Sequence, residues 1–109
     1  MSRHIFENAH FQVAVGVDHI TSTFVQVYDK RVSPVDQKDN AEIVVDNRGV
    51  EVYTMIPELE LALARLRLQF TIAHQHGNQF PNLHVDDVML ILNPLGMTNH
   101  REEVAAILD

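Results

Sequence analysis

The stretch Pro57–Gly77, PELELALARLRLQFTIAHQHG, decides the fold because it carries apolar side chains on two opposite sides of one helix. At about 100° per residue, Leu61, Leu68 and Ile72 form one stripe along the helix. A longer stripe lies on the far side and contains Leu59, Ala62, Leu63, Leu66, Phe70 and Ala73. A surface helix needs only one apolar face. The sequence therefore predicts a helix that is covered on both sides.

Signals at both ends of this stretch support a helix. Pro57 suits the first helical turn, and Gly77 suits the left-handed residue that commonly ends a helix. Glu58 and Glu60 lie near the positive end of the helix dipole. The leucines also alternate as they would in a strand, but the Leu, Ala, Arg, Glu and Gln content favours a helix.

Four segments before this helix have the alternating apolar pattern of strands, and their spacing predicts two antiparallel hairpins. These segments are His10–Asp18, Thr23–Asp29, Glu42–Asp46 and Val50–Ile56. Between the hairpins, Lys30–Asn40 has no apolar pattern and is predicted to be a solvated loop.

The C-terminal third contains two further candidate helices. Asp86–Leu92 fits either a short helix capped by aspartate or a buried strand, and its Met and Leu content favours the helix. Asn99 and Glu102 resemble a capping box that starts a last helix. The expected fold is therefore α+β in one domain, residues 1–109. It has a four-stranded antiparallel meander, one long helix packed on it, and two short C-terminal helices.

Composition narrows the classes of partner. The net charge is −7, and the eight Lys and Arg residues are scattered, which argues against nucleic-acid binding. With no cysteine, a disulfide scaffold, a thiolate metal site and a cysteine nucleophile are excluded. The first residues lack the apolar run of a signal peptide, and no uncharged segment is apolar enough to cross a bilayer. The expectation is a soluble cytoplasmic protein without a membrane partner.

Histidine is the compositional oddity, with seven in 109 residues. His74, His76, His84, Asp86 and Asp87 have the side-chain types and spacing that a divalent metal could use. However, residues two apart in a helix lie on different sides of its axis. The helix dipole accounts for histidines at a helix end, and aspartates commonly cap helices. A structural role is therefore favoured over a metal site, and no cofactor is expected.

No nucleophile elbow, phosphate-binding glycine loop or dinucleotide fingerprint occurs in the chain. The favoured hypothesis is an acidic, non-enzymatic interaction or regulatory module that acts as a homodimer or through a protein partner. Its interface would be the stripe of Leu61, Leu68 and Ile72, unless the C-terminal segments fold over that stripe. The alternative hypothesis is a small metal-dependent enzyme that uses the histidine and aspartate cluster.

Overall fold

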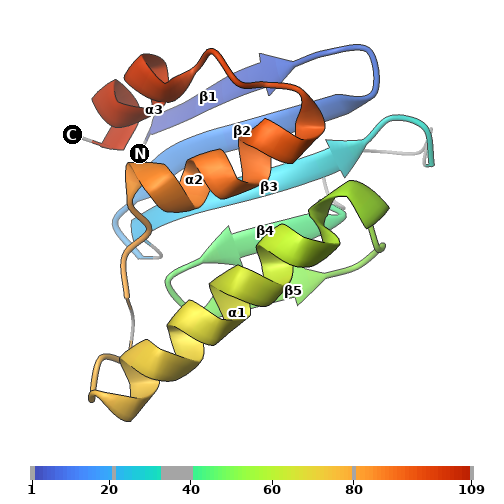
Figure 1. The fold of residues 1–109 in the computed structure, drawn as a ribbon. Helices are drawn as coiled ribbons and strands as arrows, with labels where there is room; N and C mark the ends of the chain where they lie inside the picture. Colours follow the sequence, from blue (N-terminus) through green and yellow to red (C-terminus); the bar gives the residue numbers. More distant parts are fainter. Residues whose placement is uncertain (1, 21, 33–40, 80, 109) are drawn as a thin grey trace.

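The computed structural model describes residues 2–20, 22–32, 41–79 and 81–108 of the chain. Five antiparallel strands form one sheet in sequence order, as Figure 1 shows. They are β1 (Ser2–Glu7), β2 (Phe11–Asp18), β3 (Ser22–Asp29), β4 (Ile43–Asp46) and β5 (Gly49–Val52). The α+β class and the antiparallel meander are confirmed. The predicted number of four strands is wrong, because the sheet has a fifth strand at its N-terminal edge.

The additional strand, β1, pairs with β2 along its whole length. The turn between them is built by Asn8, whose Oδ1 accepts hydrogen bonds from the backbone N–H groups of His10 (3.0 Å) and Phe11 (2.9 Å). This is the Asx-turn geometry that favours asparagine between strands. Phe6 is the one buried side chain in β1. The strand therefore lacks the alternation that identifies half-buried strands in a sequence.

The second hairpin is shorter than predicted. Asp46 pairs with Gly49 across the turn, and Gly49 has a positive φ of 132°, which favours glycine there. Strand β5 ends at Val52, and Ile56 is fully buried where the chain leaves the sheet. Most of the predicted loop Lys30–Asn40, residues 33–40, lies outside the described residues.

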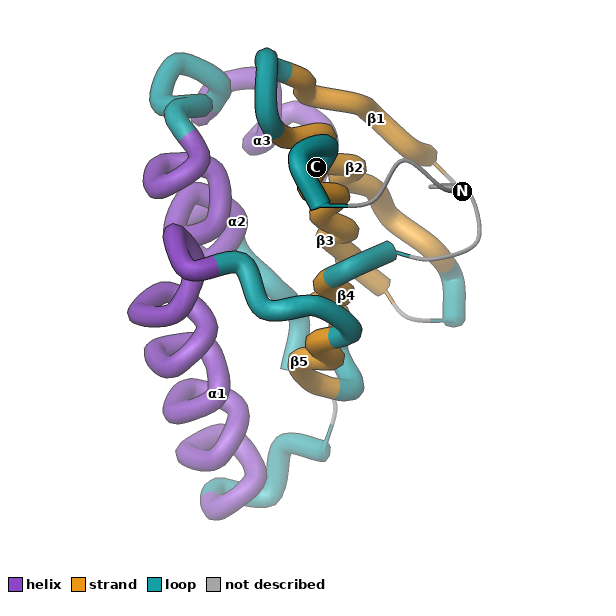
Figure 2. The backbone as a smooth tube through the Cα atoms, turned by 90° about the vertical axis from the view of Figure 1, so that its right-hand side faces the viewer, coloured by secondary structure: helices purple, strands orange, loops and turns teal. Residues whose placement is uncertain are grey.

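The helical elements all lie on one side of the sheet, as Figure 2 shows. They are η1 (Pro57–Leu59), α1 (Glu60–Gln75), α2 (Val85–Leu92), η2 (Asn93–Leu95) and α3 (Arg101–Leu108). Helix α1 crosses β5, while α3 contacts β2 (Figure 1). The first and the last helix therefore cover different parts of the sheet. The predicted long helix and the two short C-terminal helices are confirmed. Gly77, with a φ of 85°, follows α1 as predicted.

The core lies between the sheet and these helices. Strands β2, β3 and β4 each direct two fully buried aliphatic side chains toward the helices, and these are Val13, Val15, Val25, Val27, Ile43 and Val45. Leu59 of η1, together with Leu63 and Leu66 of α1, enters the same core. These three belong to the predicted sheet-facing stripe. The position of α1 is therefore fixed by the burial of one of its two apolar faces.

Candidate interaction surface

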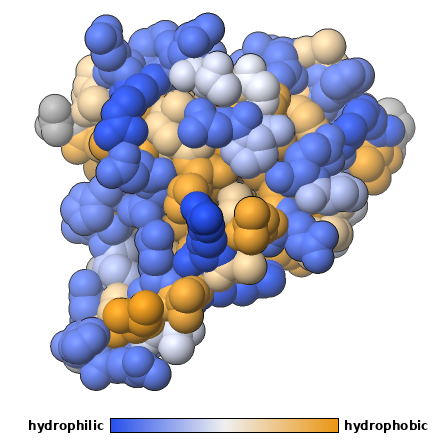
Figure 3. All heavy atoms as spheres, viewed as in Figure 1, coloured by the Kyte–Doolittle hydropathy of each residue, from blue (hydrophilic) through white to orange (hydrophobic). Residues whose placement is uncertain are grey.

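The outward side of α1 carries a row of large apolar side chains. Leu61, Leu68 and Ile72 are 70%, 60% and 46% exposed. Figure 3 shows apolar groups spaced along the diagonal where α1 crosses the front of the molecule. Because residues at spacings of seven and four share a helix face, these side chains form one continuous stripe, which we call the outward stripe.

The C-terminal segments do not cover the outward stripe. Val88 and Ile91 of α2 and Val104 of α3 are fully buried in the core between the sheet and the helices. Their apolar sides are therefore used against the sheet. This contradicts the alternative in which the C-terminal segments fold over the outward stripe. Whether the stripe is an interface stays a prediction.

A groove of about 550 Å³ runs between α1 and α2 and adjoins the outward stripe. Leu68 and Gln69 line it from α1, while Met89 and Leu90 line it from α2. Met89 is almost fully buried, and Leu90 is half-buried. The groove therefore connects the stripe to the apolar side chain of Leu90 on the second helix, between polar and charged residues.

Charged groups surround this apolar surface. Arg101 and Asp86 form an ion pair of 2.7 Å at the edge of the groove, but both side chains are largely exposed, so the pair contributes little to stability. Arg65 lies on α1 between Leu61 and Leu68 and also lines the groove. In the described ranges, no salt bridge involves Arg65. The stripe thus has a free positive charge beside its apolar centre.

The structure does not bring the candidate metal ligands together. No group of three or more His, Asp and Glu side chains suited to a metal ion occurs among the residues that are described. His74 and His76 lie exposed at the end of α1. His84 precedes α2, and its backbone N–H donates to Asp87 Oδ2 at 2.8 Å. Asp86 therefore pairs with Arg101, and Asp87 takes part in the start of α2. The metal-site alternative stays a prediction.

A second polar cluster, which the sequence interpretation missed, joins the end of β3 to the start of η1. Arg31 donates to Asp29 from Nε at 3.0 Å and from Nη2 at 2.9 Å, and it also pairs with Glu58 at 2.8 Å. The guanidinium lies 4.6 Å from the centre of the Phe11 ring, within cation–π range. Glu42 joins the cluster by accepting a hydrogen bond of 3.3 Å from the backbone N–H of Asp29.

The cluster shifts the pKa values of its carboxyl groups in opposite directions. Hydrogen bonds from Arg31 hold the pKa of Asp29 below its ordinary value, although Asp29 is 1% exposed and burial opposes the shift. The same guanidinium lowers the pKa of Glu58. Burial raises the pKa of Glu42, which is 6% exposed, and the negative charge of Asp29 adds to that rise. One arginine therefore satisfies two carboxylates, while burial raises the pKa of the third.

The chain matches no protein-family model, no curated protein and no solved structure. Among the described residues, no helix is long and apolar enough to span a bilayer.

The exposure of the outward stripe predicts how a charge placed on it affects folding. Leu68→Glu should change the free energy of unfolding by no more than about 0.5 kcal/mol, as for other surface substitutions. The matched control Leu66→Glu, two residues away on the buried face, should destabilise the chain by several kcal/mol. Urea unfolding of both variants measures the contrast. Equal losses would mean that Leu68 is buried in the folded chain.

The raised pKa of Glu42 predicts the pH dependence of its contribution to stability. A carboxyl whose folded pKa is raised favours folding while it is protonated, and this contribution is lost as the pH rises through the folded pKa. Glu42→Gln resembles the protonated form and keeps an acceptor for the Asp29 N–H. It should therefore raise the free energy of unfolding at pH 7, and its advantage should shrink toward about pH 4. Urea unfolding across pH tests this, with exposed Glu102→Gln as control. A Glu42→Gln chain no more stable than the parent at pH 7 would contradict it.

Proposed function

We propose that this chain is a small acidic, non-enzymatic interaction or regulatory module that binds a protein partner through the outward stripe of α1. The observation that carries the proposal is the exposure of Leu61, Leu68 and Ile72 in one row beside a groove that Met89 and Leu90 help to line. Fully burying a leucine or isoleucine side chain stabilises by about 1.5–3 kcal/mol. Contiguous exposed apolar surface of this kind is typical of protein–protein contact sites.

Arg65 indicates the chemistry of the partner. Its guanidinium lies within the stripe and lines the groove, so a partner that covers Leu61 and Leu68 also covers Arg65. A buried charge without a partner is costly, whereas a carboxylate would satisfy it. The surface therefore fits an amphipathic segment, such as a helix, that carries apolar side chains and an acidic one.

A second copy of the chain fits this face less well. Two antiparallel α1 helices centred on the stripe, between Leu61 and Ile72, would bring two Arg65 side chains to within about one helical turn of each other. Like charges at this spacing oppose association. A distinct acidic partner avoids that repulsion.

The alternative of a small metal-dependent enzyme has less support. It requires His74, His76 and His84 to converge with Asp86 or Asp87. In the part of the chain that the structure describes, these side chains form no such group. Asp87 instead accepts the hydrogen bond from the His84 backbone.

Photo-crosslinking in cells that produce the protein tests the proposal. A photoreactive amino acid replaces Ile72 in the stripe or, as the control, Glu102 on the exposed side of α3. We expect a discrete adduct with one protein from position 72 and none from position 102. Leu61→Glu in the same chain should lower the adduct yield by about tenfold or more, because it replaces one apolar contact with a charge.

Three results would contradict the proposal in different ways. The absence of an adduct from position 72, or an adduct insensitive to Leu61→Glu, would remove the stripe as a binding face. An adduct with twice the 12.4 kDa mass of the chain would identify a second copy as the occupant, contrary to the choice of a distinct partner.

A further inference from the structure

Strand β1 is an edge of the sheet, and its outward side pairs with no strand of the described residues. It is the first strand in the order β1-β2-β3-β4-β5, so it pairs only with β2 among the described strands. Its six residues pair without a bulge, and Arg3, His4, Ile5 and Glu7 are exposed. At the opposite edge, β5 has only four residues and lies against α1. A regular, open edge strand is a template for pairing with another strand.

The hydrogen bonds at the β1–β2 turn fix which backbone groups of β1 are free. The N–H of Asn8 donates to the carbonyl of Phe11 at 3.0 Å, so residue 8 directs its backbone groups toward β2. On the other side of β2, the N–H of Lys30 donates to the carbonyl of His10 at 2.9 Å. Residue 10 therefore directs its backbone groups toward β3, and residue 11 directs its own toward β1, which agrees with the bond from Asn8. Because the direction alternates along an antiparallel strand, Arg3, Ile5 and Glu7 direct their N–H and C=O groups outward.

We propose that two copies of the chain join through antiparallel pairing of their β1 strands, with Ile5 opposite Ile5 of the second copy. This register places Arg3 opposite Glu7 of the second copy, and Glu7 opposite its Arg3. Each of these pairs joins residues whose backbone groups point outward, so all of them are hydrogen-bonded pairs. A shift of the register by one residue would place backbone groups that point toward the second copy opposite groups that point toward its own β2. The hydrogen bonds between the two β1 strands would then be lost.

The pattern on one face of β1 is complementary to itself only in this arrangement. The side chains of successive strand residues point to opposite faces of the sheet. Phe6 is buried on the face that carries the helices, so Arg3, Ile5 and Glu7 share the other face. Opposite charges directly across two strands stabilise the pair, as do apolar side chains. Two ion pairs therefore flank one apolar contact, which opposes the general repulsion between two chains of net charge −7.

The charged side chains keep their contacts within the chain at the same time. Arg3 Nη1 donates to Gln26 Oε1 at 2.6 Å, and Glu7 forms an ion pair with Lys30. A guanidinium has five N–H donors and a carboxylate has two acceptor oxygens. Each therefore retains capacity for a partner across the new strand pair.

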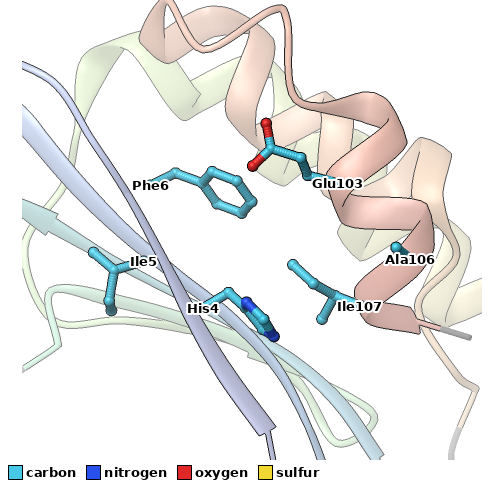
Figure 4. Close-up of a pocket in the computed structure, with 6 residues that line it drawn as sticks. All are labelled: His4, Ile5, Phe6, Glu103, Ala106 and Ile107. Carbon is cyan, nitrogen blue, oxygen red and sulfur yellow. The ribbon is translucent and has the colours of Figure 1, made fainter.

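The helix side of β1 offers a hollow that the same register would close. It has a volume of about 350 Å³, and Figure 4 shows the residues that line it, which are His4, Ile5 and Phe6 from β1 and Glu103, Ala106 and Ile107 from α3. In the proposed register, His4 of the second copy lies opposite Phe6 on this side. Pairs that are not hydrogen bonded bring their side chains closest. The hollow would then be covered by the second copy.

This inference goes beyond the proposed function and does not depend on it. Strand β1 and helix α1 lie at opposite edges of the sheet, so a β1 dimer leaves both outward stripes exposed (Figure 1). The result would be one ten-stranded sheet with an α1 helix at each end.

Charge swaps test both the occupant and the register. Arg3→Glu gives a chain with two carboxylates on its edge, and Glu7→Arg gives a chain with two guanidinium groups. Each should weaken its own dimer by about tenfold, whereas an equimolar mixture should associate within about threefold of the parent. Sedimentation equilibrium over a dilution series measures the dissociation constants. Glu51→Arg on β5 is the matched control and should leave association unchanged.

Ile5→Pro provides a second variant, because it removes an outward N–H and no hydrogen bond to β2. It should abolish the dimer, while Ile5→Val should keep it, and thermal melting checks that both fold. A parent chain that stays monomeric up to about 1 mM, the weak end of specific binding, would overturn the inference. So would a dimer unaffected by the swaps, or swaps not restored by mixing. A dimer lost only in Leu68→Glu would place the second copy on α1 instead.

Discussion

The burial of Leu59, Leu63 and Leu66 against the sheet is the contact on which the rest of the molecular surface depends. These side chains are almost fully buried and fix both the position and the rotation of α1. A helix rotated in this way must direct the opposite residues, including Leu61 and Leu68, away from the sheet. Because α2 and α3 use their apolar sides on the same sheet, no described element remains to cover them. The outward stripe is a direct consequence of how the core is packed.

The Arg31 cluster supports this arrangement at the start of the helix. Arg31 joins Asp29 at the end of β3 to Glu58 in η1, and its guanidinium stacks on Phe11 of β2. Charge-assisted hydrogen bonds with two acceptors are stronger than a single exposed ion pair. The cluster therefore links the central strands to the first turn of the helical half. The third carboxyl group of the cluster belongs to Glu42, and burial raises its pKa.

The sequence predicted those parts of the fold that have a local periodic pattern. The long helix, its terminating glycine and the central strands follow from spacings of 3.6 and two residues. Strand β1 was not predicted because Phe6 is its one buried side chain. An edge strand of this kind needs no alternation of apolar and polar residues. The link between Arg31 and Glu58 spans 27 residues and depends on tertiary packing, which no local pattern reveals. The favoured structural role of the aspartates agrees with the position of Asp87, which accepts a hydrogen bond from the His84 backbone at the start of α2.

The sequence likewise predicted one part of the candidate interaction surface and not the rest. The periodicity of α1 identified Leu61, Leu68 and Ile72 as a second apolar face, and their exposure is now established for the folded chain. What occupies that face depends on surface chemistry, such as the unpaired charge of Arg65, that becomes visible only when the neighbouring helix is placed beside it. The open edge at β1 likewise required the strand register and the direction of its backbone hydrogen bonds.

The most direct test of the central claim is the solvent accessibility of individual methyl groups in the isolated protein. A soluble gadolinium chelate added to a dilute sample with methyl-labelled leucine and isoleucine broadens the NMR signals of exposed methyl groups. If α1 is buried on one face only, the Leu61, Leu68 and Ile72 signals should broaden strongly, while those of Leu63 and Leu66 should remain sharp. Protection of Leu68 equal to that of Leu66 would show that another part of the chain covers the outward stripe.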